Sequence, residues 1–181
     1  MADEIKTLTS RVAYENQWLR VREDTIRRAD GSDGLYGVVE RGAFVVVIAQ
    51  HTDGAITLVE QYRYPVRRRL WELPMGLWEH APGTEPAVLA AAELREETGL
   101  VAGCMHYAGS LFQGPGYCNQ EGHVFLATDL TQGPHAREVT EQGMLCRAVP
   151  LAEVEAMVCD GRLVDGMSLA GLGLLRFKGW L

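Results

Sequence analysis

The chain has 181 residues, of which 47% are hydrophobic and 23% are charged, as in an ordinary globular protein. This length suits one domain with a good core, or one domain with a small extension. The formal net charge of -7 disfavours a protein that binds the phosphate backbone of nucleic acids, because such proteins are usually basic. A small anionic substrate remains compatible with this charge, provided that arginine side chains or a bound metal ion supply positive charge locally.

No apolar run is long enough to span a bilayer, and the start of the chain lacks the apolar segment of a signal peptide. We therefore expect a cytoplasmic protein that has no membrane partner. The cysteines form no CxxC pair, which disfavours a zinc site of that kind, and we expect all of them to be free thiols. They are Cys104, Cys118, Cys146 and Cys159.

The first third of the chain is predicted to form β-strands. Mixed apolar and polar residues at 12–22 precede the sequence Asp-Gly-Ser-Asp-Gly at 30–34, which is typical of a turn. The β-branched run at 43–49 is short and bounded, so it predicts a buried strand. An Asp-Gly pair at 53–54 predicts a hairpin turn that leads into a strand at 56–62.

A helix is predicted at residues 87–98, where Ala, Leu and Glu dominate. Thr84 is its expected N-cap, Pro86 is tolerated in the first turn, and Gly99 is expected to end it in a left-handed conformation. Strands should follow near 105–112, 123–127 and 144–149, and helices at 151–159 and from about 168 to the C-terminus. Strands on both sides of a central helix predict an α+β fold, namely an α/β/α sandwich with a mixed sheet.

Three glutamates, Glu93, Glu96 and Glu97, lie in the last turns of this predicted helix. Spacings of three and four residues allow their carboxylates to converge on one side. Like charges at these spacings repel, and anions near a helix C-terminus oppose the helix dipole. The cluster is either an acidic surface, partly relieved by Arg95, or a site for Mg²⁺ or Mn²⁺, which prefer oxygen ligands. The cluster alone does not decide between these interpretations.

The flanking sequence favours the metal site. Residues 72–76 (Glu-Leu-Pro-Met-Gly), a loop, and then residues 92–100 (Ala-Glu-Leu-Arg-Glu-Glu-Thr-Gly-Leu) resemble the Nudix box. That pattern is a Gly, a loop bearing a Glu, and then Arg-Glu-apolar-x-Glu-Glu-x-Gly-apolar. The resemblance implies the Nudix fold and hydrolysis of a nucleoside diphosphate linked to another group. It also implies metal ligands at Glu93, Glu96, Glu97 and the main-chain carbonyl of Met75, with Glu93 counted among the catalytic residues.

Two positions depart from the family pattern. Ala92 stands where the family has Arg, and counting back from Gly99 puts Thr84 where the first box Glu belongs. In the family these two side chains tend to pair and brace the loop against the helix, so the loss of both avoids an unmatched charge. Glu85 and Arg95 offer a shifted replacement. We interpret the departures as drift that leaves the metal ligands intact.

The resemblance covers nearly the whole chain and points to the ADP-ribose pyrophosphatase branch of the family. The N-terminal strands, residues 60–64, residues 72–74 and the loop Gly-Pro-Gly-Tyr-Cys-Asn-Gln at 114–120 carry it. It implies that residues 1–40 form an antiparallel β extension involved in dimerisation and that residues 41–181 form the Nudix domain. Relatives often have Asp-Glu where this chain has Asn119 and Gln120, a change that removes two potential negative charges near the site.

A general base is expected on a loop that precedes a strand, where the family places it. Glu141 and Glu138 are the candidates, and Glu141 fits better by its distance to residues 149–151. Arg63 is expected either to bind a phosphate bidentately or to form a surface ion pair. The expected substrate site also contains Glu72, Gly116 and Tyr117, whose ring could stack on a base.

The leading hypothesis is metal-dependent hydrolysis of a nucleoside-diphosphate sugar, with ADP-ribose giving AMP and ribose 5-phosphate. Mg²⁺ is the expected cofactor and Mn²⁺ the alternative. Two alternatives remain: the same fold with another substrate, such as GDP-mannose or a damaged nucleotide, or a nucleotide-binding module whose catalytic site has decayed. The resemblance further implies a homodimer, and the expected partner is a small molecule rather than nucleic acid.

Overall fold

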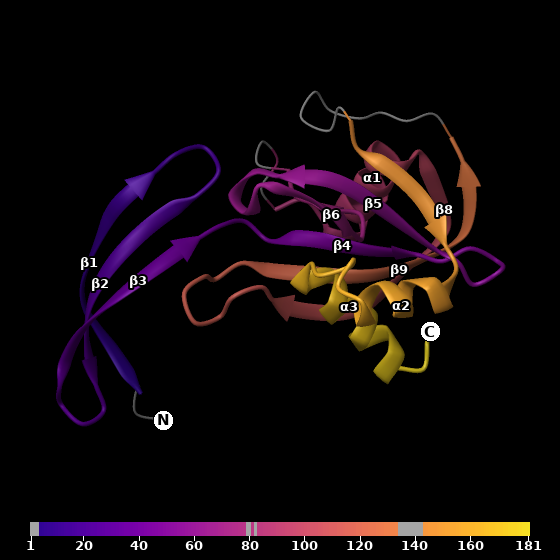
Figure 1. The fold of residues 1–181 in the computed structure, drawn as a ribbon. Coiled ribbons are helices and arrows are strands. Elements are labelled where there is room, and N and C mark those ends of the chain that lie inside the picture. Colours follow the sequence, from indigo (N-terminus) through magenta and orange to yellow (C-terminus); the bar gives the residue numbers. More distant parts are fainter. Residues whose placement is uncertain (1–3, 79–80, 82, 134–142) are drawn as a thin grey trace. The chain divides into compact units, whose positions relative to one another are not determined.

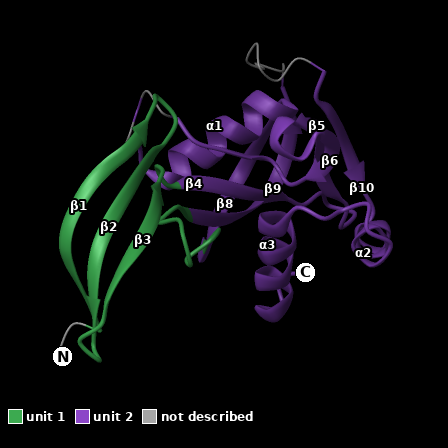
Figure 2. Ribbon diagram, turned by 60° about the vertical axis from the view of Figure 1, so that its left-hand side comes forward, with its two compact units in different colours: residues 1–43, 112–121 green, residues 44–111, 122–181 purple. Residues whose placement is uncertain are grey.

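The computed structural model describes residues 4–78, 81, 83–133 and 143–181. It divides into two compact units, drawn in different colours in Figure 2: unit 1 contains Met1–Ala43 and Phe112–Glu121, and unit 2 contains Phe44–Leu111 and Gly122–Leu181. The helices are α1 (Pro86–Thr98), α2 (Leu151–Cys159) and α3 (Gly166–Phe177), with a 3-10 turn η1 (Tyr64–Val66) (Figure 1). The strands are β1 (Ile5–Glu15), β2 (Arg20–Arg28), β3 (Asp33–Glu40), β4 (Phe44–Ala49), β5 (Ile56–Arg63), β6 (Arg68–Glu72), β7 (Met75–Gly76), β8 (Leu100–Phe112), β9 (Glu121–Gln132) and β10 (Leu145–Val149).

Unit 1 is built on a three-stranded antiparallel sheet in the order β1-β2-β3. The turn predicted at residues 30–34 joins β2 to β3, and the N–H of Ser32 donates to the Asp30 carboxylate there, at 2.9 Å. Every residue of these three strands is described, and of them only Asp24 and Ile26 are buried. The sheet therefore has little core of its own, and β1 is exposed along its whole length.

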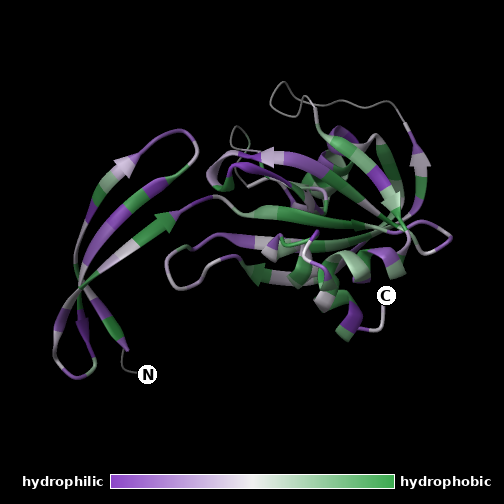
Figure 3. Ribbon diagram, viewed as in Figure 1, coloured by the Kyte–Doolittle hydropathy of each residue, from purple (hydrophilic) through white to green (hydrophobic). Residues whose placement is uncertain are grey.

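A four-stranded sheet in the order β7-β4-β9-β8 forms the centre of unit 2. β4 is antiparallel to β7 and parallel to β9, so the sheet is mixed, as predicted. Every residue of β4 is buried, which confirms the buried strand expected from its β-branched run. The central position of this apolar strand is visible in Figure 3. A second sheet of unit 2 has the order β10-β5-β6.

Two hydrophobic cores lie on opposite faces of β4, because successive side chains of a strand point in opposite directions. Val45, Val47 and Ala49 pack with apolar residues of α1. The alternate side chains of β4 pack with residues of α2 and α3, and this second core includes Phe44, Val46, Ile48, Val154, Met157, Met167 and Leu175. Unit 2 is therefore an α/β/α sandwich, and the predicted α+β fold class is confirmed (Figure 1).

The N-cap predicted for α1 was wrong by one residue. Glu85 caps the helix, since its carboxylate accepts from the N–H of Ala87 at 2.7 Å, while the Thr84 hydroxyl donates to the carbonyl of Ala81 at 2.8 Å. A carboxylate at this position also has the favourable charge for the helix dipole. Gly99 ends the helix in the left-handed conformation that the sequence predicted, with φ 74.

The C-terminal helices differ in how well their ends were predicted. α2 has the expected bounds, whereas α3 begins at Gly166 and ends at Phe177. Its earlier start follows from Asp165, whose side chain accepts from the N–H of Ser168 and caps the helix. No helix within the described ranges is both long and apolar enough to cross a membrane.

Candidate active site

The three predicted metal ligands lie on α1 with different burial. Glu93 and Glu97 are only 5% and 2% exposed, whereas Glu96 is partly exposed and Arg95 is exposed. The first two carboxylates share the face of α1 that packs on the sheet, because residues four apart in a helix are neighbours. A solvated acidic surface would leave both in water, so that interpretation of the cluster is wrong for Glu93 and Glu97. Burial of a carboxylate is costly unless hydrogen bonds or a cation compensate.

Gly76 lies directly against the carboxylate of Glu93. β7 pairs with β4, with Gly76 opposite Val45 and Met75 opposite Val46. A Cβ placed on Gly76 would lie 2.7 Å from Oε1 and 2.5 Å from Cδ of Glu93, which is closer than real contacts allow. The main chain of β7 therefore lies directly against this carboxylate, and the absence of a side chain at position 76 makes the contact possible. The structure thus places the Met75–Gly76 segment next to Glu93.

The donor atoms of this site suit a hard divalent cation. Carboxylate and main-chain carbonyl oxygens are the ligands that Mg²⁺ prefers in proteins. Among the residues that the structure describes, no group of three or more His, Cys, Asp or Glu side chains lies close enough together to hold an ion. Glu93 and Glu97 are buried on the face of α1 that packs on the sheet, whereas the Glu96 side chain is partly exposed. Glu93 and Glu97 therefore fit the metal site as they stand, and Glu96 fits it in donor chemistry alone.

Two of the predicted substrate-binding residues, Arg63 and Glu72, bind each other. Nε of Arg63 donates to both carboxylate oxygens of Glu72, at 2.9 and 3.0 Å, and Nη2 donates to Oε2 at 2.5 Å. Glu72 is fully buried and the Arg63 side chain is partly exposed. Arg63 therefore forms an ion pair, as one of the two alternatives predicted, but its partner Glu72 lies in the core and not at the surface.

The charges around Arg63 favour its ionised form. Burial alone would lower the pKa of the Arg63 guanidinium, but the hydrogen bonds and charge of Glu72, with the charges of Glu97 and Asp165, leave this pKa raised. Burial raises the pKa of the Glu72 carboxyl in spite of the bond to Arg63, and the Asp165 charge adds to that rise. Arg63 is thus a cation surrounded by the carboxylates of this site.

A hydrogen-bonded network that the sequence analysis missed holds the segment before β7. The N–H of Leu73 donates to Oγ of Ser168 at 2.8 Å, and that hydroxyl donates to Asp165 at 2.8 Å. Next to it, the carbonyl of Pro74 accepts from the N–H of Val47 at 2.9 Å. The spacing of Asp165 and Ser168 is a capping pattern, which would have predicted the start of α3 from the sequence. The bond from Leu73 to Ser168 joins residues 95 positions apart, and no local pattern predicts it.

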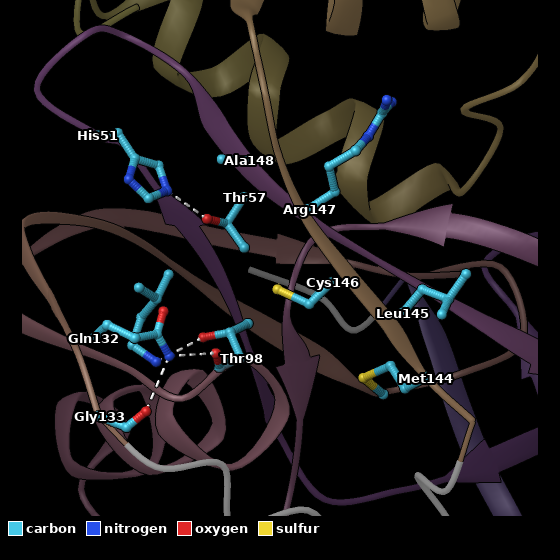
Figure 4. A pocket seen from close by; sticks show the side chains of 11 residues that line it. His51, Thr57, Thr98, Gln132, Gly133, Met144, Leu145, Cys146, Arg147 and Ala148 are labelled. Atoms are coloured by element: carbon cyan, nitrogen blue, oxygen red, sulfur yellow. Dashed lines mark hydrogen bonds between the residues drawn. The ribbon is translucent and has the colours of Figure 1, made fainter.

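Both candidate bases, Glu138 and Glu141, lie outside the described residues. Two described residues, Gly133 and Met144, line a cavity of about 630 Å³. Figure 4 shows Thr98, the residue after Glu97, and Gln132 in the same wall, with Gln132 Nε2 donating to the carbonyl of Gly133 at 3.0 Å. This cavity lies beside the C-terminus of α1.

The remaining predicted features are placed as follows. Gly116 and Tyr117 lie in unit 1, whereas the glutamates of α1 lie in unit 2. The replacement brace between Glu85 and Arg95 is not formed, because Glu85 caps the helix instead. All four cysteines are free thiols, as predicted.

Comparison with known proteins identifies the family of the chain. Residues 39–163 match the model of the NUDIX domain, and residues 5–39 match that of the nucleoside diphosphate sugar hydrolase N-terminal domain. An ADP-ribose pyrophosphatase of Mycobacterium tuberculosis is 34% identical over 93% of this chain and 82% of its own length. One of Bacillus subtilis is 30% identical over 97% of this chain and 94% of its own. A crystal structure of an ADP compounds hydrolase superimposes with a TM-score of 0.85 at 18% identity, covering 99% of this chain and 98% of that one.

These matches define a hydrolase of the pyrophosphohydrolase class. The chain belongs to the Nudix family, because the family model covers more than half of it and a relative is 34% identical along nearly its whole length. The predicted family, fold and enzyme class are therefore confirmed, and a divalent metal requirement is general in this family.

We expect Gly76→Ala to weaken binding of Mn²⁺ or Mg²⁺ at least tenfold, since the new methyl group would displace the Glu93 carboxylate. Isothermal titration calorimetry would measure this. Gly173→Ala is the matched control: its Cβ would meet nothing within 4 Å, and α3 should gain up to about 1 kcal/mol in stability. Equal metal affinity of the two variants would contradict the role of Gly76 in positioning the Glu93 carboxylate.

We expect Arg63→Met to lower the free energy of unfolding by about 2–4 kcal/mol, because it leaves the buried Glu72 carboxylate without its cation. Adding Glu72→Gln should recover part of that loss. Burial raises the pKa of Glu72, so its contribution to stability is present at low pH and lost as the pH rises through that raised value. The defect of Arg63→Met should therefore shrink on acidification. Urea unfolding between pH 4 and 8 tests this, and a loss independent of Glu72 would refute the coupling.

Proposed function

We propose that the protein hydrolyses the diphosphate linkage of ADP-ribose to AMP and ribose 5-phosphate. The buried pair Glu93 and Glu97, with the Glu93 carboxylate directly against Gly76, is the observation that carries the proposal. Two relatives of at least 30% identity are ADP-ribose pyrophosphatases, which supports ADP-ribose as the substrate. A small anionic substrate, rather than nucleic acid, also suits a chain with a net charge of -7.

Glu93, Glu96, Glu97 and the carbonyl of Met75 are the proposed ligands of Mg²⁺. When bound, the ion neutralises the diphosphate charge and lowers the pKa of the attacking water. Glu96 completes the set by turning its partly exposed side chain toward the other two, which costs little because that side chain is not packed in the core. Mn²⁺ has the same preference for oxygen ligands and should substitute.

The protein's own side chains carry the remaining steps. Glu141 is the proposed general base, with Glu138 as the second candidate, and it accepts a proton from the water that attacks phosphorus. One P–O bond forms to that water and the bridging P–O bond breaks, so the two products each leave with one phosphate. Arg63, held by Glu72 in a raised-pKa ionised state, orients a phosphate oxygen through the guanidinium edge that Glu72 does not occupy.

We further propose a cytoplasmic homodimer in which residues 1–40, as an extension to the Nudix domain at 41–181, form the interface. β1 has no buried residue, and its exposed apolar side chains are Ile5, Leu8, Val12 and Tyr14. An exposed strand of eleven residues with apolar side chains is a surface that a second chain would cover. Free cysteines suit the reducing cytoplasm.

The enzyme should turn over ADP-ribose with Mg²⁺ at a higher kcat/KM than GDP-mannose or oxidised nucleotides, and EDTA should abolish the reaction. Glu97→Gln should lower kcat/KM at least a hundredfold, because the site loses a buried charge. Glu155→Gln, the same change at an exposed residue of α2, should leave the activity at the wild-type level. Chromatographic separation and quantitation of the nucleoside monophosphate formed from each compound decides, and turnover of none of the compounds would refute the proposal.

Val12→Glu should convert the dimer to a monomer, because it places a charge on the exposed face of β1. Val101→Glu makes the same change at an exposed valine of β8 and should leave the dimer intact. Light scattering after size-exclusion chromatography measures the mass. A wild-type monomer, or a Val12→Glu dimer of unchanged stability, would argue against this interface.

A further inference from the structure

Residues 114–118 form a tight turn that is held against β3 within unit 1. The N–H groups of Tyr117 and Cys118 both donate to the carbonyl of Gly114, at 3.0 and 2.8 Å. The N–H of Val39 donates to the carbonyl of Tyr117 at 2.7 Å, and the N–H of Asn119 donates to that of Val39 at 3.1 Å. These bonds make a parallel bridge between Val39 and Cys118. The turn is therefore tied to β3 by its main chain on both sides of Cys118.

The turn presents the ring of Tyr117. A Cβ on Gly114 would lie 2.7 to 2.9 Å from Cε1, Cζ and Oη of Tyr117, so the ring lies on the bare main chain of this glycine. Tyr117 is nevertheless 59% exposed. Before it, the carbonyl of Gly116 accepts from the hydroxyl of Tyr36 at 2.9 Å. An aromatic ring that is supported on one side and exposed elsewhere is a stacking surface for a nucleobase.

Asn119 and Gln120 follow the turn, and one side-chain amide accepts a hydrogen bond while the other donates one. Asn119 uses its carbonyl oxygen, which accepts from the N–H of Arg41 at 3.1 Å. Gln120 uses its NH₂ group, which donates to the carbonyl of Gly42 at 2.9 Å. Gln120 is only 2% exposed, so it cannot be a surface on which the substrate rests. A carboxylate could replace the first amide but not the second, because a carboxylate is an acceptor alone.

We propose that Gln120 is a positioning residue, which fixes the turn at 114–118 so that Tyr117 stacks on the base of the substrate. This inference rests on the function proposed above for the nucleotide part of the substrate. Glutamate at position 120 would set a buried anion against the carbonyl of Gly42, and both acceptors would then lack a donor. The hydrogen bond that Gln120 donates thus accounts for an amide rather than a carboxylate at position 120, whereas the bond at Asn119 accommodates either.

Hydrogen exchange of the ligand-free protein tests directly whether Gln120 fixes the turn at 114–118. Gln120→Glu and Gln120→Met both remove the donor, and both should speed exchange of the Val39 and Asn119 amides at least tenfold. Gln113→Glu is the matched control, since it makes the same chemical change at an exposed side chain of the same loop. Asn119→Asp keeps the acceptor for Arg41, so it should disturb exchange less than Gln120→Glu does.

Binding of the non-hydrolysable α,β-methylene analogue of ADP-ribose tests the link to the substrate. Gln120→Met should raise Kd about tenfold in calorimetry, and Tyr117→Ala should raise it at least as much. Tyr117→Phe retains the ring and should bind more tightly than Tyr117→Ala. In the hydrolysis assay the same variants should raise KM more than they lower kcat, because the turn binds the base and not the reacting phosphates.

The outcomes separate this inference from the proposed function. Wild-type exchange rates in both Gln120 variants would show that Gln120 does not fix the turn. Faster exchange with unchanged analogue affinity would show that the turn does not contribute to substrate binding. Faster exchange with weaker analogue binding supports the inference even if ADP-ribose is not hydrolysed, a result that would refute only the proposed reaction. If Gln120→Glu fails to fold by circular dichroism, Gln120→Met, which adds no charge, decides alone.

Discussion

The approach of the β7 main chain to the carboxylate of Glu93 is the constraint on which the candidate site depends. It requires a glycine at position 76, because any Cβ there would overlap the carboxylate. It also requires both elements to be fixed. β7 pairs with the fully buried strand β4, and α1 packs its apolar side chains on the same strand. The hydrophobic core therefore sets the distance between the glycine and the glutamate, and the site inherits the rigidity of that core.

Three buried glutamates, on α1 and β6, lie in unit 2. Glu93 and Glu97 carry negative charge into the interface between α1 and the sheet, while Glu72 carries it to the end of β6. Arg63 holds Glu72 and also lies in the fields of Glu97 and Asp165. Such an arrangement gives little stability by itself, since desolvation offsets much of the attraction between buried charges. In the proposed function, its value is in placing a cationic side chain close to the carboxylates that would hold the metal ion, which is what an anionic diphosphate needs.

Unit 1 is held together differently, because it has a small core and many exposed strand residues. Main-chain and amide hydrogen bonds, rather than apolar packing, hold its turn at 114–118 in place. Hydrogen bonds fix direction more narrowly than hydrophobic contacts do, and a buried donor without an acceptor costs free energy. This explains how a loop far along the chain can be ordered against β3 with little burial.

Much of the fold follows from local patterns in the sequence. The apolar run at 43–49, the Asp-Gly turn at 53–54 and Gly99 at the end of α1 act through near neighbours, and the structure confirms each. The spacing of Glu93 and Glu97 likewise placed both on one helix face, and the surrounding box named the family. The N-cap at Glu85 was missed because Thr is a preferred N-cap residue and Glu is not, while the cap that forms depends on the backbone path into the helix.

Only the tertiary structure decided which polar groups meet. The sequence showed Arg63 and Glu72 as separate candidates, and the folded chain joins their side chains although the β5–β6 register pairs Arg63 with Arg68 and Glu72 with Val59. The bonds from Leu73 to Ser168 and from Gln120 to Gly42 span 95 and 78 positions, and no local pattern encodes them. The sequence by itself determined the elements, the acidic helix and the family, because those depend on propensity and spacing along one chain segment. Burial of the glutamates and the partners of the buried amides depend on how distant segments pack, and only the folded chain decides that.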